Sequence, residues 1–155
     1  MPDPTFVPDD FTVPVTFAGT GFHLEPLGPE HNDADLEAWT SSIEHIRATP
    51  GFPDGSWPPL DGMSAADNER DLTRHANDFR KRTGFTYTVL DDNRVIGCVY
   101  IYPPSPRDST GERVAELRCW VRADRAELDD PLRQAVSQWL ESWPFDRVEV
   151  PGTVT

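Results

Sequence analysis

The sequence predicts a mixed α/β fold in one domain, with the element order β-α-α-β-β-β-α-β. Three observations support this prediction. Three segments repeat their apolar residues at helical spacing, five segments alternate them at strand spacing, and turn-forming residues separate the segments. At 155 residues the chain is long enough to bury the core of a single domain. We expect residues 1–21, which contain four prolines, to form an extended arm and residues 22–155 to form the domain.

The domain is predicted to begin with a strand and a helix. Residues 22–27 alternate apolar and polar side chains, as a short strand does. Residues 32–49 carry apolar side chains at steps of three and four, which indicates a helix. Asn32 or Asp33 is expected to cap that helix.

A turn-rich loop and a second helix are expected next. The loop surrounds Trp57 and is rich in proline and glycine. Ser64 followed by Asp67 is typical of a capping box, so it predicts the start of a helix that continues to about Thr83.

Three strands follow in the prediction. Residues 85–90 and 94–103 flank an Asp-Asp-Asn turn and form a hairpin, and residues 113–122 form the third strand. Counting inward from the loop places Cys98 and Cys119 nearly opposite each other and on one face. We interpret them as buried, inert thiols, because a redox pair or a thiol nucleophile would need an activating base nearby.

The last predicted elements are a helix and a strand. Pro131 suits the first helical position, which makes Asp130 the expected cap. Residues 146–152 then form a strand, and the strand–helix–strand connection makes the final pair parallel. The helix is expected to bury one face, formed by Leu132, Ala135, Val136, Trp139 and Leu140.

The chain is strongly acidic, with a formal net charge of −13 from 14 Lys and Arg against 27 Asp and Glu. Such a field repels nucleic acid and anionic membranes and attracts cationic partners such as amines. We therefore expect no nucleic-acid or membrane partner. A bacterial cytosolic proteome of high-GC origin has the same acidic character, so the charge alone does not define a substrate.

Other classes of protein are disfavoured by composition. Two cysteines without a CxxC motif or a Cys/His cluster argue against a metal site and a disulfide framework. The sequence contains no apolar run near the ~20 residues that span a bilayer, and its first residues are acidic and interrupted by proline. A reducing cytoplasm is the expected location.

The segments "FTYTVLDDNRVIGCVYIYP" and "AELRCWV", followed by "LRQAVSQWL", resemble the GNAT superfamily of acyl-CoA N-acyltransferases. The phrases "SIEHI" and "WPF" are similar to a group of small bacterial GNAT-like proteins. The resemblance covers about residues 22–152. It implies a splayed sheet that holds acetyl-CoA between its fourth and fifth strands. It also implies a base that takes a proton from an attacking amine.

Residue by residue, the resemblance assigns the cofactor to the fourth strand and the following loop. A backbone N–H among Cys119, Trp120 and Val121 would hold the acyl carbonyl. The loop that opens the third helix would hold the pyrophosphate, with help from Arg122, Arg125 and Ala126.

Two departures from the family pattern weigh against acetyl-CoA. The family's loop has the signature Q/R-x-x-G-x-G/A, whereas this chain reads "RAELDD" from Arg125, a degenerate form without glycine. Asp130, as a cap, would also use N–H groups that phosphate needs. The fold is further expected to be truncated after its fifth strand, because the chain ends at Thr155 and offers no tyrosine for the family's acid role.

Glu116, Tyr100 and Tyr102 are the candidate catalytic residues. Glu116 lies on the fourth strand of the resemblance, where it could act as a general base, or it could be a solvent-facing partner of Arg118. Tyr100 and Tyr102 share a face, so they could line an acceptor pocket or replace the missing acid, or they could pack amphipathically.

The candidate substrate contacts lie in the first helical region and the loop after it. His45, with Glu44 or Arg47, could contact substrate, or it could cap the last carbonyls of its helix. Trp57 could close over a substrate or anchor its loop to the core. His75 is interpreted as packed rather than catalytic.

Three functions remain open on the sequence. The first is an N-acetyltransferase that acts on a small-molecule amine with acetyl-CoA as cofactor. The second is a degenerate GNAT-fold protein that does not bind CoA and serves as a binding or assembly module. In the latter case a homodimer could cover the open edge of the sheet. The third is a GNAT-fold enzyme that performs other biosynthetic chemistry.

Overall fold

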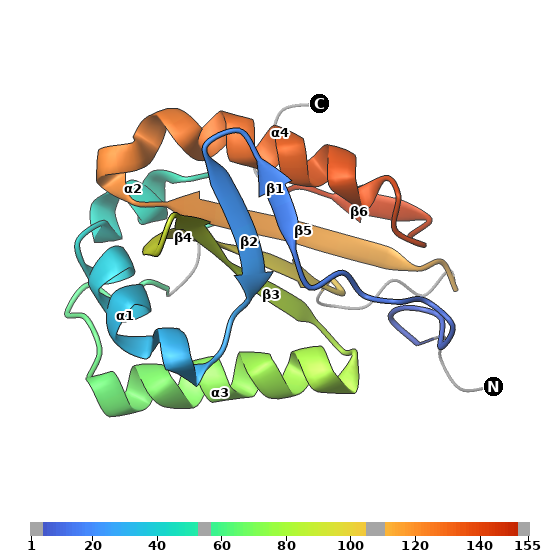
Figure 1. Cartoon of the computed structure of the whole chain (residues 1–155), viewed down its shortest axis with the longest axis horizontal. Coiled ribbons are helices and arrows are strands. Elements are labelled where there is room, and N and C mark those ends of the chain that lie inside the picture. Colours follow the sequence, from blue (N-terminus) through green and yellow to red (C-terminus); the bar gives the residue numbers. More distant parts are fainter. Residues whose placement is uncertain (1–4, 53–56, 105–110, 152–155) are drawn as a thin grey trace.

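The computed structural model describes residues 5–52, 57–104 and 111–151, which form a six-stranded sheet with helices on both faces (Figure 1). The strands are β1 (Phe17–Gly19), β2 (Phe22–Pro26), β3 (Phe85–Asp91), β4 (Arg94–Tyr102), β5 (Val114–Val121) and β6 (Arg147–Glu149). They lie in sequence order across the sheet, antiparallel except for the parallel pair β5–β6. The predicted mixed α/β class, the hairpin and the parallel final pair are confirmed.

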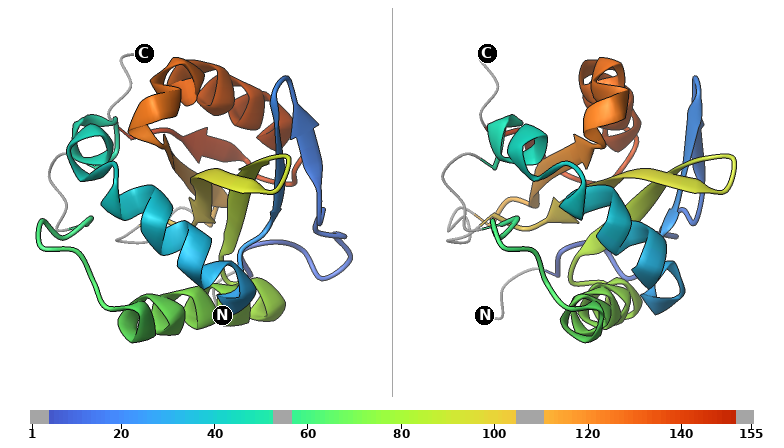
Figure 2. Two further views of the ribbon diagram at one scale, coloured as in Figure 1. Left: turned by 60° about the vertical axis from the view of Figure 1, so that its left-hand side comes forward. Right: turned by 90° about the vertical axis from the view of Figure 1, so that its left-hand side faces the viewer.

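The helices are η1 (Pro29–His31), α1 (Asn32–Thr40), α2 (Ile43–Ala48), α3 (Ala65–Lys81), η2 (Ala123–Leu128) and α4 (Asp129–Leu140), where η1 and η2 are 3₁₀ helices. Helix α4 covers one face of the sheet, and α1 and α3 cover the other (Figure 2). No helix among the described residues is long and apolar enough to cross a membrane.

The two faces of the sheet divide the core into two parts, and a register irregularity between Val89 and Leu90 of β3 lets Ile96 and Val99 of β4 share a face. Ile96, Val99 and Ile101 of β4 face α4, where they pack with Leu132, Val136 and Leu140. Val95 and Cys98 point to the other face and pack with Trp39 of α1 and Trp120 of β5. The core on the α4 side is the larger of the two and includes Phe6 and Val7, so the N-terminal segment is packed against the domain.

The structure differs from the prediction at three places outside the site. Residues 17–19 of the expected arm form strand β1, which pairs with β2. The single helix predicted over residues 32–49 is two helices, because the chain turns at Ser41 and Ser42. Asp130 is not a cap: α4 begins at Asp129, two residues before the predicted start at Pro131, and Asp130 is an exposed partner of Arg133 at 2.8 Å.

The cysteine prediction is also wrong in its geometry. Cys98 pairs with Trp120, and Cys119 pairs with Val99, so the two thiols lie on opposite faces of the sheet. Both are buried and free, as expected for inert thiols. Burial raises the pKa of each thiol, which makes its nucleophilic form scarce.

Gly97 allows β4 and β5 to lie close together at the level of Trp120. A Cβ at this position would lie 2.3 Å from the Trp120 carbonyl oxygen, far inside the normal contact distance. The glycine therefore lets β5 hold Trp120 against the α1 side of the sheet. In contrast, β6 pairs only with Val114–Glu116, the first residues of β5.

Candidate ligand-binding site

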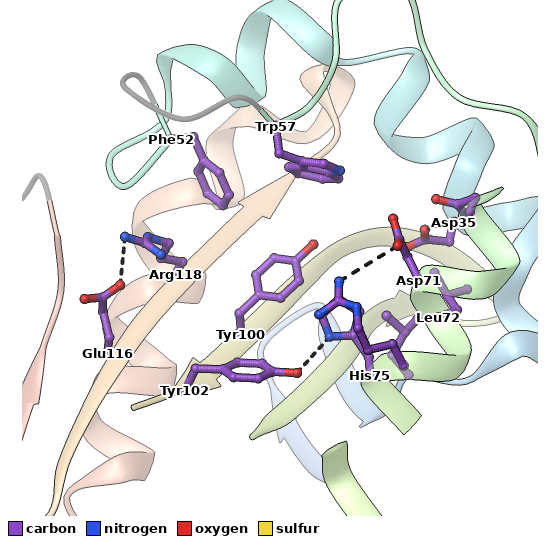
Figure 3. A pocket seen from close by; sticks show the side chains of 13 residues that line it. Asp35, Phe52, Trp57, Asp71, Leu72, His75, Tyr100, Tyr102, Glu116 and Arg118 are labelled. Carbon is purple, nitrogen blue, oxygen red and sulfur yellow. Dashed lines mark hydrogen bonds and ion pairs between the residues drawn. The ribbon is translucent and has the colours of Figure 1, made fainter. Parts of the chain in front are cut away.

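A cavity of about 370 Å³ lies between the sheet and helices α1 and α3 (Figure 3). Strands β4 and β5 supply one side through two cross-strand pairs, Tyr100 with Arg118 and Tyr102 with Glu116. Because paired residues share a face, all four side chains line the cavity. The remaining lining residues come from α1, α3, Leu27 and the loop after α2.

Asp35 of α1 is a nearly buried carboxylate that lines this cavity. Only 4% of the residue is exposed, and its Oδ2 accepts a hydrogen bond from Asn68 Nδ2 at 3.2 Å. Burial raises its pKa from 3.8 to about 6, although the Asn68 bond and the charge of His31 act in the opposite direction. Among the described residues, no ion pair includes Asp35. At neutral pH a negative charge therefore lies inside the cavity without an ion-pair partner.

Asn68 of α3 fixes the position of that carboxylate. Its Nδ2 also donates to Asn32 Oδ1 at 2.8 Å, while its Oδ1 accepts from Trp39 Nε1 at 3.0 Å. The amide thus connects α1 to α3 through one buried side chain. Because an orientation with oxygen and nitrogen exchanged would lose all of these bonds, Asp35 meets a donor of fixed direction.

An aromatic wall lines the cavity between its Asp35 end and its β5 end. The Trp57 ring lies 6.4 Å from Tyr100 and 6.0 Å from Phe52, measured between ring centroids. It also contacts Trp39 at 5.4 Å, so the same side chain anchors its loop and lines the cavity. Tyr100 is held by Trp120, whose Nε1 donates to the Tyr100 hydroxyl at 3.0 Å.

His75 of α3 lies beside Tyr102 in a chain of hydrogen bonds. Its Nδ1 is 2.9 Å from the Tyr102 hydroxyl and 3.0 Å from Thr86 Oγ1, and the Tyr102 hydroxyl donates to Asp78 at 2.8 Å. Burial lowers the pKa of His75 to about 4, with a further contribution from the charge of Arg74. His75 is therefore neutral at pH 7, and burial raises the pKa of Tyr102 so that its hydroxyl stays protonated.

The opposite end of the cavity carries an ion pair. Arg118 Nη2 lies 2.7 Å from Glu116 Oε1, and the arginine side chain is 44% exposed against 17% for the glutamate. The expected pairing of Glu116 with Arg118 is thus present, on the cavity wall rather than in open solvent.

The η2 segment and the start of α4 form a second region, at the far end of β5. The Ala123 N–H donates to Ser42 Oγ at 2.8 Å, and His45 Nε2 lies 2.6 Å from Asp129 Oδ2. We call these two contacts between α2 and the loop the α2 clasp. Within the loop, the Arg125 N–H donates to the Arg122 carbonyl at 2.9 Å.

The charged side chains of this loop are paired with one another and with neighbouring elements. Arg122 binds both oxygens of Glu37 and lies 3.2 Å from Asp124 Oδ1. Arg125 Nη2 lies 2.7 Å from Asp91 Oδ2. An external anion could bind either arginine only by breaking one of these internal ion pairs.

The structure brings together only some of the residues that the sequence indicated. Glu116, Tyr100, Tyr102 and Trp57 surround one cavity. The other candidates are not among the residues that line it: Glu44 and His45 of α2, Cys119 and Val121 of β5, Trp120 behind Tyr100, and Arg122, Arg125 and Ala126 near η2.

Asp35 and Asn68 are candidate functional residues that sequence reasoning missed. A signal was present, because Asp35 lies four residues before Trp39 and Asn68 four residues before Leu72. Side chains at this spacing share one face of a helix, so both polar residues belong to buried faces. Charged or amide side chains on a buried face need partners, which makes them informative.

Comparison with solved structures identifies the fold as that of the GNAT acetyltransferases. The ribosomal L7/L12 α-N-protein acetyltransferase RimL matches with a TM-score of 0.63 and 11% identity, over 88% of this chain and 68% of RimL. The microcin C7 self-immunity acetyltransferase MccE, solved with acetyl-CoA and AMP, matches with a TM-score of 0.60 and 10% identity, over 85% and 69%. The ribosomal-protein-S5-alanine acetyltransferase from Vibrio fischeri gives 0.59 and 10%, over 83% and 69%. No family model and no curated protein matches the sequence.

The GNAT fold implies a CoA-type cofactor, but the residues at η2 do not fit its pyrophosphate. Two loop N–H groups, those of Ala123 and Arg125, already have acceptors inside the protein. The first turn of α4 carries Asp129 and Asp130, which take the favourable position for negative charge at a helix N-terminus. A bound pyrophosphate would have to displace the α2 clasp and would lie against like charges.

Proposed function

We propose that this protein binds a small organic amine, as its ammonium form, in the cavity between β4, β5, α1 and α3. The observation that carries the proposal is Asp35, a carboxylate that is 4% exposed, lines the cavity and has no ion-pair partner among the described residues. A buried charge of this kind is costly unless it is paired, and an ammonium ligand would supply the missing partner.

The rest of the cavity suits such a ligand. Trp57 and Tyr100 present aromatic rings, which attract cations through their π faces and cover the apolar part of an amine. Asp71 adds a second carboxylate, although Arg74 Nη2 lies 3.9 Å from it. The overall charge of −13 increases the local concentration of cations around the chain.

A comparison of phenethylamine with phenethyl alcohol tests the proposal. The two probes have nearly the same shape, and only the amine is charged at pH 7. We expect the amine to bind the full chain at least about tenfold more tightly, as measured by NMR titration, because a charge-assisted hydrogen bond replaces a neutral one. Equal affinities for amine and alcohol, or no binding of either, would show that the cavity does not recognise an ammonium group.

N-acyl transfer to the bound amine is the second candidate function. It is favoured by the likeness of the fold to acetyltransferases and by the short pairing of β5 with β6, which leaves β5 beyond Glu116 unpaired by β6. In this function Glu116 is the candidate base for an amine that reaches the β5 end of the cavity, opposite Asp35, and Tyr100 or Tyr102 is the candidate acid. The misfit at η2 weighs against a CoA-type donor, so this candidate ranks second.

Titration with acetyl-CoA by calorimetry, at low and moderate salt, decides between the two candidates. Micromolar binding that weakens with salt would support acyl transfer and contradict our interpretation of the α2 clasp. If no heat of binding is measured up to millimolar acetyl-CoA, transfer of an acyl group from acetyl-CoA is excluded. Amine binding then remains as the proposed function.

A further inference from the structure

We propose that the occupant of the cavity is bipolar, with an ammonium group at one end, a carboxylate at the other and an apolar body between them. This inference depends on the proposed function, because Asp35 is the anchor for the ammonium group. Figure 3 shows Asp35 on one side of the cavity and Arg118 on the other. Between these two charges lie the rings of Phe52, Trp57 and Tyr100.

Arg118 is available to a ligand although it already has a partner. One terminal nitrogen of the guanidinium contacts Glu116, and a guanidinium carries five N–H donors in a planar fork. With 44% of its side chain exposed, the arginine is more accessible than Glu116 at 17%. The ligand at this end therefore meets a positive group, supported from behind by a carboxylate.

The arginine stem lies close to Gly51 of the loop after α2. A Cβ at Gly51 would lie 3.2 Å from Arg118 Cγ, and Gly51 has a φ of +99°. A side chain at this residue would be strained and would push the arginine stem away. Gly51 thus leaves room for the arginine stem, and the contact with Glu116 orients the guanidinium, which reduces the entropy lost when it binds an anion.

The two ends of the cavity select the orientation and the charge pattern of the ligand. A carboxylate at the Asp35 end would meet the negative charges of Asp35 and Asp71, with Arg74 already 3.9 Å from Asp71, and an ammonium at the other end would meet Arg118 first. A diamine or a dicarboxylate would thus place one of its charges against a like charge. Only a molecule with opposite charges at its ends satisfies both.

The test uses a series of straight-chain ω-amino acids of increasing length, each compared with its own methyl ester. The ester keeps the ammonium and the chain but removes the negative charge. For at least one length we expect the acid to bind the full chain about tenfold more tightly than its ester, and we expect added salt to reduce the difference. The readout is the dissociation constant from NMR titration.

The variant Arg118→Met should abolish the preference for the acid while the esters still bind. Arg70→Met is the matched control, because Arg70 is an exposed arginine of α3 that does not line the cavity. If every acid binds no better than its ester, the bipolar ligand is excluded although amine binding stands. If neither acids, esters nor phenethylamine bind, the proposed function itself fails.

Discussion

The cavity and the η2 loop both contain several charged side chains, but they differ in how far these charges are paired within the protein. At the loop, Arg122 and Arg125 are matched with Glu37, Asp124 and Asp91, and the exposed backbone is held by the α2 clasp. At the cavity, Asp35 is buried with an amide donor and without an ion-pair partner in the described part of the chain. The difference indicates that charged groups already paired within the protein are poor binding groups for a ligand. An unpaired buried charge beside a cavity marks the place where a ligand contributes the partner.

The largest expected effect is on the pH dependence of folding stability. The folded-state pKa of Asp35, about 6, is above its ordinary value of 3.8, so stability from this group is present below pH 4 and is lost as the pH rises through 6. The loss amounts to about 3 kcal/mol. His75 acts in the opposite sense over a similar range, because its folded pKa is lowered to about 4.

The variant Asp35→Asn isolates the Asp35 contribution from that of His75. Urea denaturation should show that the free energy of unfolding of the variant rises relative to that of the wild type by about 3 kcal/mol between pH 4 and pH 7. The reason is that the amide cannot ionise. Asp33→Asn is the matched control, an exposed carboxylate on the same helix. A difference between variant and wild type that does not change with pH would mean that Asp35 is not a strained, buried carboxylate.

The next effect is on ligand affinity. Asp35→Asn should weaken phenethylamine binding about thirtyfold at pH 7, or about 2 kcal/mol, while leaving phenethyl alcohol unchanged. The same titration on Asp33→Asn should match the wild type. If Asp35→Asn binds the amine normally, another carboxylate of the cavity holds the ammonium, and the contrast between cavity and loop loses its main support.

A smaller loss of affinity is expected from the aromatic wall. Trp57→Ala should weaken phenethylamine binding about fivefold, because it removes a cation–π contact and apolar cover of about 1 kcal/mol. Trp57→Phe keeps a ring at the same place and should recover most of the affinity. Equal binding by the alanine and phenylalanine variants would show that the tryptophan only anchors its loop.

The smallest effect is expected at the loop. Glu37→Gln removes the carboxylate that binds Arg122, but this glutamate side chain is 64% exposed. The free energy of unfolding should therefore change by less than about 1 kcal/mol, and the affinity for the amine should not change. A large loss of stability would show that the paired charges of the loop are as important to the fold as the buried Asp35 network.

Much of the fold was predictable from sequence because strong local signals agreed with tertiary packing. Ser64 does accept a hydrogen bond from the Asp67 N–H at 3.1 Å, and the apolar face of α4 is the one that packs on the sheet. The predictions that failed were those that depend on the exact register of a strand pair or on the exact first residue of a helix. Cys98 and Cys119 are displaced by one position from the expected pairing, and a shift of one residue reverses the face of a strand.

The candidate site was only partly predictable. The alternation of β4 indicated that Tyr100 and Tyr102 share a face, and the actual register of β4 with β5 places Glu116 beside them on the wall of one cavity. The spacing of Asp35 from Trp39 placed it on a buried helical face, but the sequence did not indicate its role, because that role depends on Asn68 of another helix, 33 residues away along the chain. Contacts between distant segments determine whether a polar side chain on a buried helical face is paired with solvent, protein or ligand.

The placement of the two thiols gives this protein a pair of built-in reporters of local opening. Cys98 belongs to the core beneath the cavity, and Cys119 to the core beneath α4. Neither can react with a labelling reagent unless its side of the sheet opens, so the two labelling rates measure the breathing of each half separately. A ligand held by Asp35 would slow the labelling of Cys98 more than that of Cys119, which would locate an unknown occupant without any assay of activity.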